Sequence, residues 1–334
     1  MRIESSITSL SWIPSEAVVG ANKVMFESGV AHYDDPPPDT ITDLAALQAA
    51  DRFRFANRLH AWIEVQDGRV VSAGYEKDSG GLMGSTTVRV AKKEATFAAP
   101  SMPELQTDPD VTDAAAVFTQ TVGGHTALPA PRRVSRPPFV QLRAPLVWTT
   151  LSLTLRADGS SEATMTGAST FPRHWVYDAE GRLTAKAGLA DFKDWYRKSF
   201  GKHTPWGDTN TKAYVTAVET ALERELATSI MRSGERPEIR KLKEGALLTE
   251  QGAAGDELYL LLDGVLVVEV DGAELAELGP GAILGERAVL EGGTRTCTLR
   301  AVTKARVAVA GAEQVDRAKL AEVSVGHRRE HQAG

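Results

Sequence analysis

One short stretch near the C-terminal end of the sequence carries residue types that can bind a small anion. Gly285-Glu286 is followed by Gly292-Gly293 and then by Arg295-Thr296. An arginine can neutralise one confined negative charge, and backbone N–H groups of a short helical turn can complete the hydrogen bonds of that anion. A carboxylate accepts a hydrogen bond from a ligand hydroxyl, and a threonine hydroxyl can donate one. This stretch is therefore the first candidate for a binding site.

Residues elsewhere carry weaker signals for chemistry. The five histidines before residue 210 show no metal-ligand spacing such as His-Glu-x-x-His, and no cysteine lies near them. The glycine-rich run 80–84 is not followed by Gly-Lys-Ser, so a phosphate-binding P-loop is not supported. His125 and His174 stand beside turns at expected strand ends, which makes them the best of the weak catalytic candidates. We predict no catalytic residue and no metal site.

The elements around the anion-binding stretch have the pattern of a small β structure. From Ile239 to Ala310 short apolar runs alternate with turns that contain glycine, a residue that adopts backbone angles other residues avoid. Several compact strands joined in this way are typical of a jelly roll. The expected strands cover residues 257–262, 265–270, 273–278 and 297–302.

The same region resembles the cyclic-nucleotide-binding domain family. The run Gly245-Ala246-Leu247-Leu248, the glycines Gly252, Gly255 and Gly264, and the segment Asp256-Glu257-Leu258-Tyr259 are similar to the opening strands of these domains. The stretch 285–301 resembles their phosphate-binding cassette, including that of the bacterial catabolite activator. The resemblance covers about the last third of the chain and implies a jelly roll that binds a cyclic nucleotide.

The resemblance also implies a role for each cassette residue. Arg295 and Thr296 would bind the cyclic phosphate, and Glu286 would accept a hydrogen bond from the ribose 2′-hydroxyl. Gly285, Arg287 and Ala288 would contribute mainly through their backbone. Arg287 and Leu284 depart from the aliphatic residue and the phenylalanine that the family often has at these positions. Thr296 does not separate cAMP from cGMP, so we expect cAMP and keep cGMP as the alternative.

Helical patterns lie on both sides of this domain. Val215, Val218, Leu222, Leu226 and Ile230 form one apolar stripe, which predicts a connecting helix over residues 211–231. A second helix is expected over 312–329, where the family places the helix that closes over the base. No helix-turn-helix pattern follows it, so the DNA-binding half of the catabolite activator family is not expected.

The first two-thirds of the chain resembles no family known to us. Pro36-Pro37-Pro38 indicates a linker behind an N-terminal arm, and residues 43–55 have helical spacing with Thr42 or Asp43 as the cap. Three hairpins are expected, with strands at 61–65 and 69–73, at 148–155 and 162–166, and at 175–177 and 183–186. Residues 40–200 therefore predict an antiparallel β barrel or sandwich with flanking helices.

Bulk composition limits the remaining functions. The chain has 334 residues, 42% of them hydrophobic, and a net charge of −6. From Arg236 onward 13 Lys and Arg stand against 16 Asp and Glu, which disfavours nucleic acid as a partner. No stretch is apolar and long enough to predict a membrane span, and the sequence shows no secretion signal and one cysteine, which predicts a cytoplasmic protein.

These observations predict a mainly β (α+β) protein with three parts. Residues 1–210 form a β-rich domain, 211–235 a connecting helix and 236–334 a cyclic-nucleotide-binding domain. The expected function is a cyclic-nucleotide receptor that signals to its N-terminal domain, to a protein partner or within a homo-oligomer. Two alternatives remain open: an enzyme with its active site in the N-terminal domain, regulated by the C-terminal one, and a scaffold whose cassette binds nothing.

Overall fold

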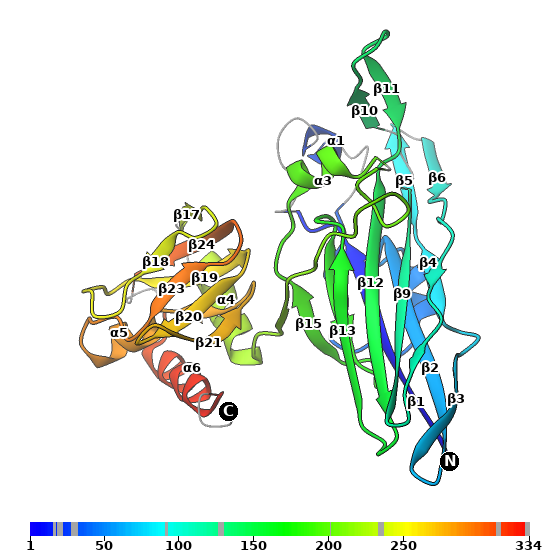
Figure 1. Cartoon of the computed structure of the whole chain (residues 1–334). Helices are drawn as coiled ribbons and strands as arrows, with labels where there is room; N and C mark the ends of the chain where they lie inside the picture. The colour runs from blue at the N-terminus through cyan, green and yellow to red at the C-terminus, as the bar shows by residue number, and fades with distance from the viewer. Residues whose placement is uncertain are drawn as a thin grey trace. The chain divides into compact units, whose positions relative to one another are not determined.

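The computed structural model divides the chain into two compact units (Figure 1). The N-terminal unit contains residues 1–185 and 190–213, and the C-terminal unit contains residues 186–189 and 214–334. The structure describes residues 1–15, 18, 23–27, 33–90, 93–125, 130–200, 202–232, 237–311 and 315–330.

The N-terminal unit is built from two antiparallel sheets. In the first sheet the strand order is β15-β14-β1-β2-β3, and β4 also pairs with β2. These strands are β1 (Arg2–Trp12), β2 (Phe55–Gln66), β3 (Arg69–Tyr75), β4 (Gly80–Met83), β14 (Arg173–Tyr177) and β15 (Leu183–Ala187). In the second sheet the order is β13-β12-β9-β7, and β8 also pairs with β9. These strands are β7 (Leu105–Gln106), β8 (Asp110–Val111), β9 (Ala115–His125), β12 (Leu146–Arg156) and β13 (Ser161–Ala168).

Polar side chains join the two sheets through the interior. Ser9 Oγ on β1 lies 2.8 Å from Thr149 Oγ1 on β12. Asn57 on β2 donates to the Thr149 carbonyl at 3.0 Å, and Gln120 on β9 donates to Asn57 Oδ1 at 2.7 Å. All four residues are buried. Together with the surrounding apolar side chains, these hydrogen bonds fix how the two sheets pack against each other. Within the described residues the sheets do not close into a barrel, and the unit is a sandwich.

The three predicted hairpins are confirmed. In the first, Asp67 and Gly68 between β2 and β3 both have positive φ, at 50° and 75°. Such a turn matches the twist of the strands that it joins. The hairpin of β12 and β13 and the turn between β14 and β15 contain Gly159 and Gly181, which also have positive φ.

Two predictions for the start of the chain are wrong. Residues 2–12 are not an arm, because they form β1 between β14 and β2 in the first sheet. The helix expected over 43–55 is α2 (Leu44–Ala49), capped by Asp43, whose Oδ1 accepts from the Ala46 N–H at 2.9 Å. It ends early because Asp51 takes a left-handed conformation with φ at 53° and Phe55 already belongs to β2.

The remaining elements of the N-terminal unit are short. Two of its antiparallel hairpins are formed by β5 with β6 and by β10 with β11. The bounds are α1 (Lys23–Glu27), β5 (Ser85–Val90), β6 (Lys93–Ala98), β10 (Ala130–Arg133), β11 (Val140–Arg143) and α3 (Phe192–Lys198). Phe192 and Trp195 of α3 are buried against Phe171, so this helix covers one part of the sandwich core.

The C-terminal unit contains two four-stranded antiparallel sheets, with the strand orders β17-β24-β19-β22 and β18-β23-β20-β21. Their strands are β17 (Glu238–Leu242), β18 (Leu247–Thr249), β19 (Leu258–Asp263), β20 (Leu266–Val270), β21 (Ala273–Leu278), β22 (Ile283–Leu284), β23 (Thr298–Ala301) and β24 (Ala305–Ala310). The short strand β16 (Val215–Ala217) belongs to neither of these two sheets. Side chains from both sheets form one apolar core that includes Leu261, Leu266, Leu299 and Val307. The four strands expected from the sequence are present.

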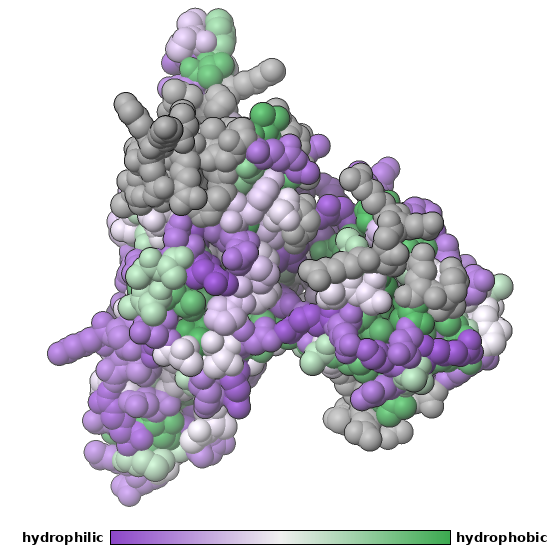
Figure 2. Space-filling view, turned by 180° about the vertical axis from the view of Figure 1, so that it is seen from behind, coloured by the Kyte–Doolittle hydropathy of each residue, from purple (hydrophilic) through white to green (hydrophobic). Residues whose placement is uncertain are grey.

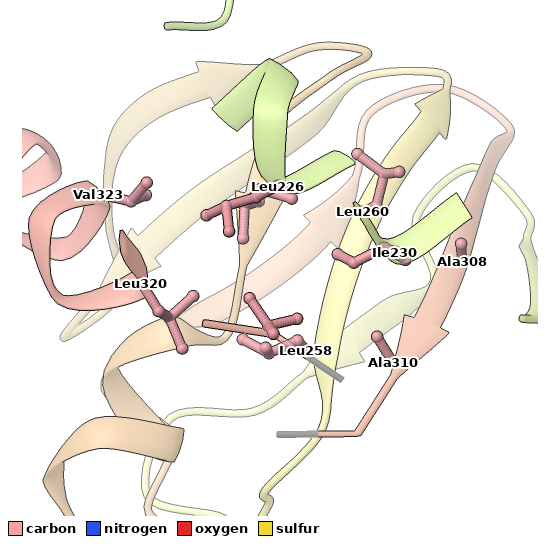
Figure 3. Packing of buried hydrophobic residues seen from close by; sticks show 10 residues of the cluster. Leu226, Ile230, Leu258, Leu260, Ala308, Ala310, Leu320 and Val323 are labelled. Atoms are coloured by element: carbon pink, nitrogen blue, oxygen red, sulfur yellow. The ribbon is translucent and has the colours of Figure 1, made fainter. Parts of the chain in front are cut away.

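Helices cover one side of this unit. Leu226 and Ile230 of α4 (Ala221–Arg232) and Leu320 and Val323 of α6 (Arg317–Glu330) pack on Leu258 and its neighbours on β19 and β24 (Figure 3). Of the predicted stripe, Leu222, Leu226 and Ile230 pack in this way, whereas Val215 lies in β16 and Val218 precedes the helix. The helix predicted over 211–231 begins only at Ala221, because Thr220 and Glu223 form a capping box: the Glu223 carboxylate accepts from the Thr220 N–H at 2.8 Å and the Thr220 hydroxyl accepts from the Glu223 N–H at 3.2 Å.

The visible surface is mixed in character. Figure 2 shows hydrophobic residues in small patches that are separated by hydrophilic ones. Among the described residues no helix has the length and the hydropathy needed to cross a bilayer.

Candidate functional site

A cavity of about 410 Å³ lies in the C-terminal unit, beside α5 (Glu286–Glu291). All six residues predicted from the cassette line it: Gly285, Glu286, Arg287, Ala288, Arg295 and Thr296. Apolar side chains of β20, β21 and β23 form the rest of the wall, among them Val268, Leu278 and Leu299. The cavity therefore joins a polar rim to an apolar wall, as sites for small molecules usually do.

Arg295 is held by a set of contacts from β19 and from the turn before it. Its Nη1 donates to the Glu257 carbonyl at 2.9 Å, and its Nη2 donates to the Tyr259 hydroxyl at 3.2 Å. The guanidinium carbon also lies 5.1 Å from the centre of the Tyr259 ring. The side chain is buried, at 5% exposure. A buried arginine with a fixed orientation is suited to bind an anion that enters the cavity.

The Tyr259 hydroxyl is itself fixed. It donates to Glu257 Oε2 at 2.7 Å, and Arg240 binds the other oxygen of that carboxylate at 3.2 Å. Burial raises the pKa of Tyr259, so the hydroxyl keeps its proton. The hydrogen bond from Tyr259 lowers the pKa of Glu257, which keeps the carboxylate charged. The chain of contacts from Arg240 through Glu257 and Tyr259 to Arg295 restricts where the Arg295 guanidinium can lie.

Two glycines give Arg295 its space. A Cβ atom at Gly255 would lie 2.4 Å from Arg295 Nε, and one at Gly285 would lie 2.6 Å from Nη1 and 2.8 Å from the Glu257 carbonyl oxygen. Gly285 also has φ at 85°, a left-handed conformation that is unfavourable for residues with a side chain, and it lies directly before α5. Gly255 and the cassette residue Gly285 thus leave room for the Arg295 side chain.

Glu286 is the first residue of α5 and is 7% exposed. One of its oxygens, Oε1, lies 3.1 Å from Nδ1 of His327, a residue of α6 that also lines the cavity. The other ring nitrogen of His327 lies 3.3 Å from Glu223 Oε1 on α4. Cys297 lines the cavity as well, but burial raises the pKa of its thiol, so it is a poor nucleophile.

Sequence reasoning found the cassette but not its supporting residues. Glu257 and Tyr259 belong to the segment that resembles the family's opening strands, but the sequence indicates no role for them, and Glu257 lies directly before β19 while Tyr259 lies in it. His327 belongs to the helix expected over 312–329, and its sequence context indicates no role for it. Its place in the last turns of that helix was the available signal, but nothing in the local sequence identifies its two glutamate partners.

The two histidine candidates of the N-terminal unit are hydrogen-bonded to neighbouring groups. His174 is fully buried: its Nε2 lies 2.8 Å from the Ser169 carbonyl, and its Nδ1 lies 2.7 Å from Ser11 Oγ. Burial lowers its pKa to about 4, so the ring is neutral and has no access to a substrate. His125 Nδ1 is 2.8 Å from the Ala144 carbonyl, beside a cavity of only about 60 Å³.

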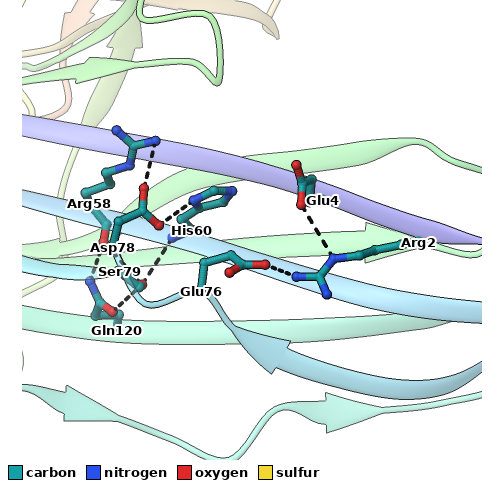
Figure 4. A network of polar contacts seen from close by, with 8 residues as sticks. All are labelled: Arg2, Glu4, Arg58, His60, Glu76, Asp78, Ser79 and Gln120. Atoms are coloured by element: carbon teal, nitrogen blue, oxygen red, sulfur yellow. Dashed lines mark hydrogen bonds and ion pairs between the residues drawn. The ribbon is translucent and has the colours of Figure 1, made fainter. Parts of the chain in front are cut away.

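A polar network on the first sheet contains serine, histidine and aspartate but lacks the geometry of a nucleophile (Figure 4). His60 Nδ1 lies 2.6 Å from Asp78 Oδ1. The Ser79 hydroxyl instead donates to Gln120 Oε1 at 2.9 Å and accepts from the backbone N–H of His60 at 3.1 Å. The imidazole therefore does not activate this hydroxyl, as a catalytic triad would require. Among the described residues no group of three or more acidic, histidine or cysteine side chains is placed to hold a metal ion.

Comparison with known proteins places a family in the region of the cavity. Residues 239–320 match the family model described as Cyclic nucleotide-binding domain. Over 63 residues, 19% of this chain, the sequence is 33% identical to the cGMP-dependent protein kinase egl-4 of Caenorhabditis briggsae. The match spans 8% of the length of that kinase.

Two similar solved structures each cover more than a quarter of the chain. A cyclic nucleotide-binding domain from Methylobacillus flagellatus is 24% identical, with 28% of this chain and 53% of that chain covered and a TM-score of 0.21. The cAMP-bound form of the EAL enzyme Bd1971 is also 24% identical, with 29% of each chain covered and a TM-score of 0.24. The family match and the cassette around the cavity lead to one conclusion: the C-terminal third of this chain carries a cyclic nucleotide-binding domain, matched over residues 239–320.

Proposed function

We propose that the protein is a receptor for cAMP, with cGMP as the alternative ligand, and that ligand binding in the C-terminal unit regulates the N-terminal unit or a partner. The observation that carries this proposal is the cavity, because all six cassette residues line it together with an apolar wall. The cavity volume of about 410 Å³ lies within the range of pockets for small ligands.

The charges around the cavity support an anionic ligand with a sugar hydroxyl. Arg295 would bind the cyclic phosphate, with Thr296 as a further hydrogen-bond donor. Glu286 would accept from the ribose 2′-hydroxyl and so favour a ribonucleotide. The purine would lie against the apolar side chains of β20, β21 and β23. Arg287 also lines the cavity, at a position where the family often has an aliphatic residue. None of the proposed contacts with the ligand requires the Arg287 side chain.

Two relatives by sequence are named as cGMP-dependent protein kinases. This similarity supports a regulatory role for the domain, and it is a reason to test cGMP as well as cAMP. These kinases share only a short segment with this chain, so no kinase activity is proposed. The proposed output is a change in the rest of the chain, because regulation needs a ligand that binds two states with different affinity.

Calorimetry of the purified chain with cAMP and with cGMP tests the proposal. Arg295→Ala should abolish measurable binding, because the phosphate would lose its charge-assisted contact inside a buried cavity. Arg300→Ala is the matched control: this arginine is on the adjacent β23, pairs with Glu269 at 2.7 Å and does not line the cavity. Unchanged affinity in Arg295→Ala would contradict the site assignment. A wild-type chain that binds neither nucleotide at millimolar concentration would favour a scaffold with an unused cassette.

A further inference from the structure

A histidine of α6 joins two glutamates at the edge of the cavity. His327 Nδ1 lies 3.1 Å from Glu286 Oε1, and Nε2 lies 3.3 Å from Glu223 Oε1. The three side chains come from α6, α5 and α4, which are separate in the sequence and meet at this point. Glu223 and Glu286 are almost completely buried, and His327 is 20% exposed.

The two partners determine the charge of this histidine. A neutral imidazole has one donor and one acceptor nitrogen, whereas an imidazolium has two donors. Because both ring nitrogens face a carboxylate oxygen, the charged form fits the site. The hydrogen bond to Glu223, followed by that to Glu286, raises the pKa of His327 to about 10. The imidazolium therefore offsets the negative charge of the carboxylate that lines the cavity.

Glu223 is anchored by two backbone N–H groups. Its Oε1 also lies 3.3 Å from the Ile283 backbone N–H, which donates to it, and its Oε2 accepts from the Thr220 N–H at 2.8 Å. Glu223 thus belongs to the capping box that begins α4. Glu223 does not line the cavity, and His327 bridges it to Glu286.

We propose that His327 is a positioning residue that sets the affinity of the cavity for a cyclic ribonucleotide by acting through Glu286. The ring fixes Glu286 Oε1 and leaves Oε2 for the ribose 2′-hydroxyl. Its positive charge reduces the repulsion between this carboxylate and the ligand's phosphate. Through Glu223 the same ring links the occupied cavity to the first turn of α4. The inference rests on the proposed function, because it requires that Glu286 accept a hydrogen bond from the ribose 2′-hydroxyl of the ligand.

The test compares cAMP with 2′-deoxy-cAMP, which lacks the hydroxyl assigned to Glu286. By calorimetry, His327→Gln should bind cAMP about ten-fold more weakly, the effect of losing roughly one charge-assisted hydrogen bond. Its affinity for 2′-deoxy-cAMP should fall less, so the preference for the ribonucleotide decreases. Glu223→Gln, a second variant whose side chain does not line the cavity, should show the same loss of preference.

Lys319→Gln is the matched control. Lys319 also lies on α6 and pairs with Glu225 of α4, but it does not line the cavity. This variant should keep the affinity of the wild-type chain for both ligands. If Lys319→Gln lowers the affinity for cAMP as much as His327→Gln does, the histidine only holds α6 in place and the inference is wrong.

Two further outcomes separate the inference from the proposed function. A wild-type chain that binds neither cAMP nor cGMP overturns the proposed function and the inference with it. A wild-type chain that binds cAMP, with a His327→Gln variant of equal affinity or with equal losses for cAMP and 2′-deoxy-cAMP, overturns the inference alone.

Discussion

The position of the Arg295 guanidinium depends on a residue that has no side chain. A Cβ at residue 255 would lie 2.4 Å from Arg295 Nε and 2.6 Å from Nη2. The end of an arginine side chain can move, so the backbone around Gly255→Ala should remain in place while the guanidinium leaves its site. We therefore expect Gly255→Ala to lower the affinity for cAMP at least about ten-fold, because the charge-assisted contact with the phosphate is lost. Calorimetry measures the affinity, and thermal unfolding should show little change.

Gly245→Ala should lower the stability and leave the affinity unchanged. Gly245 lies in the turn between β17 and β18 with φ at 78°, and no atom would lie within 4 Å of its Cβ. Alanine is strained in this conformation, so the melting temperature should fall while the affinity stays close to that of the wild-type chain. If Gly255→Ala lost stability and kept its affinity, the close approach to Arg295 would not limit binding.

At the level of residues, the sequence predicted the cassette but not its support. Glycine, glutamate and arginine in one short stretch are local signals, and the cavity contains all of them. The partners of these residues come from other elements: Tyr259 from β19 and His327 from α6. Their roles depend on which elements pack together, and a single sequence does not contain that distance information.

At the level of elements, helix α6 should be held by a pH-dependent contact. The folded-state pKa of His327 is raised to about 10 by its bonds to Glu223 and Glu286, against a usual value of about 6.5. A raised pKa means that the contact contributes its full stability below pH 6.5 and loses it as the pH rises through 10. Unfolding of the wild-type chain and of His327→Gln should differ by several degrees at pH 6 and converge near pH 10.

The contribution of Glu223 to stability has the opposite pH dependence and is lost at acidic pH. Burial alone would raise its pKa, but the bonds from His327 and Thr220 outweigh this effect and lower it. Its contribution is present above the unfolded value of about 4.5 and is lost as the pH falls below it. A difference between the wild-type chain and His327→Gln that stays constant from pH 6 to pH 10 would contradict the assignment of the imidazolium.

The elements were predicted best where turns mark their ends. The strands from β19 to β23 alternate with glycines, and the three hairpins of the sandwich have turn residues with positive φ. β1 was missed because its buried side chains include Ser6, Ser9 and Ser11, so its composition does not indicate a central strand. The start of α4 was placed too early, although Thr220 and Glu223 are spaced as a capping box.

At the scale of the whole molecule, the chain passes between the two units three times. It does so near residues 185, 189 and 213. The four residues 186–189 belong to the C-terminal unit, although β15 begins at Leu183 in the N-terminal unit. Gly188 fixes this short segment: its N–H donates to the Tyr214 carbonyl at 2.7 Å, and its carbonyl accepts from the Gly264 N–H at 2.6 Å. Lys186 adds an ion pair with Glu219 at 2.6 Å.

If ligand binding is signalled to the N-terminal unit, this segment is a covalent route for it. We expect cAMP to slow hydrogen exchange in residues 183–189 of the wild-type chain as well as in the cassette. A Cβ at Gly188 would lie 2.3 Å from Cγ2 of Val265, which is fully buried and cannot move easily. Gly188→Ala should therefore displace the segment, remove the response at residues 183–189 and leave the affinity for cAMP within about two-fold, since no residue of the segment lines the cavity.

Exchange measured by mass spectrometry with and without cAMP distinguishes signalling from simple binding. Gly159→Ala is the control, because Gly159 lies in the turn between β12 and β13 and no atom would lie within 4 Å of its Cβ. This variant should keep the response of residues 183–189. Protection confined to the cassette in the wild-type chain would mean that the nucleotide binds without a signal along this route. An unchanged response in Gly188→Ala would mean that the signal, where one exists, does not depend on how residues 186–189 are held against Val265.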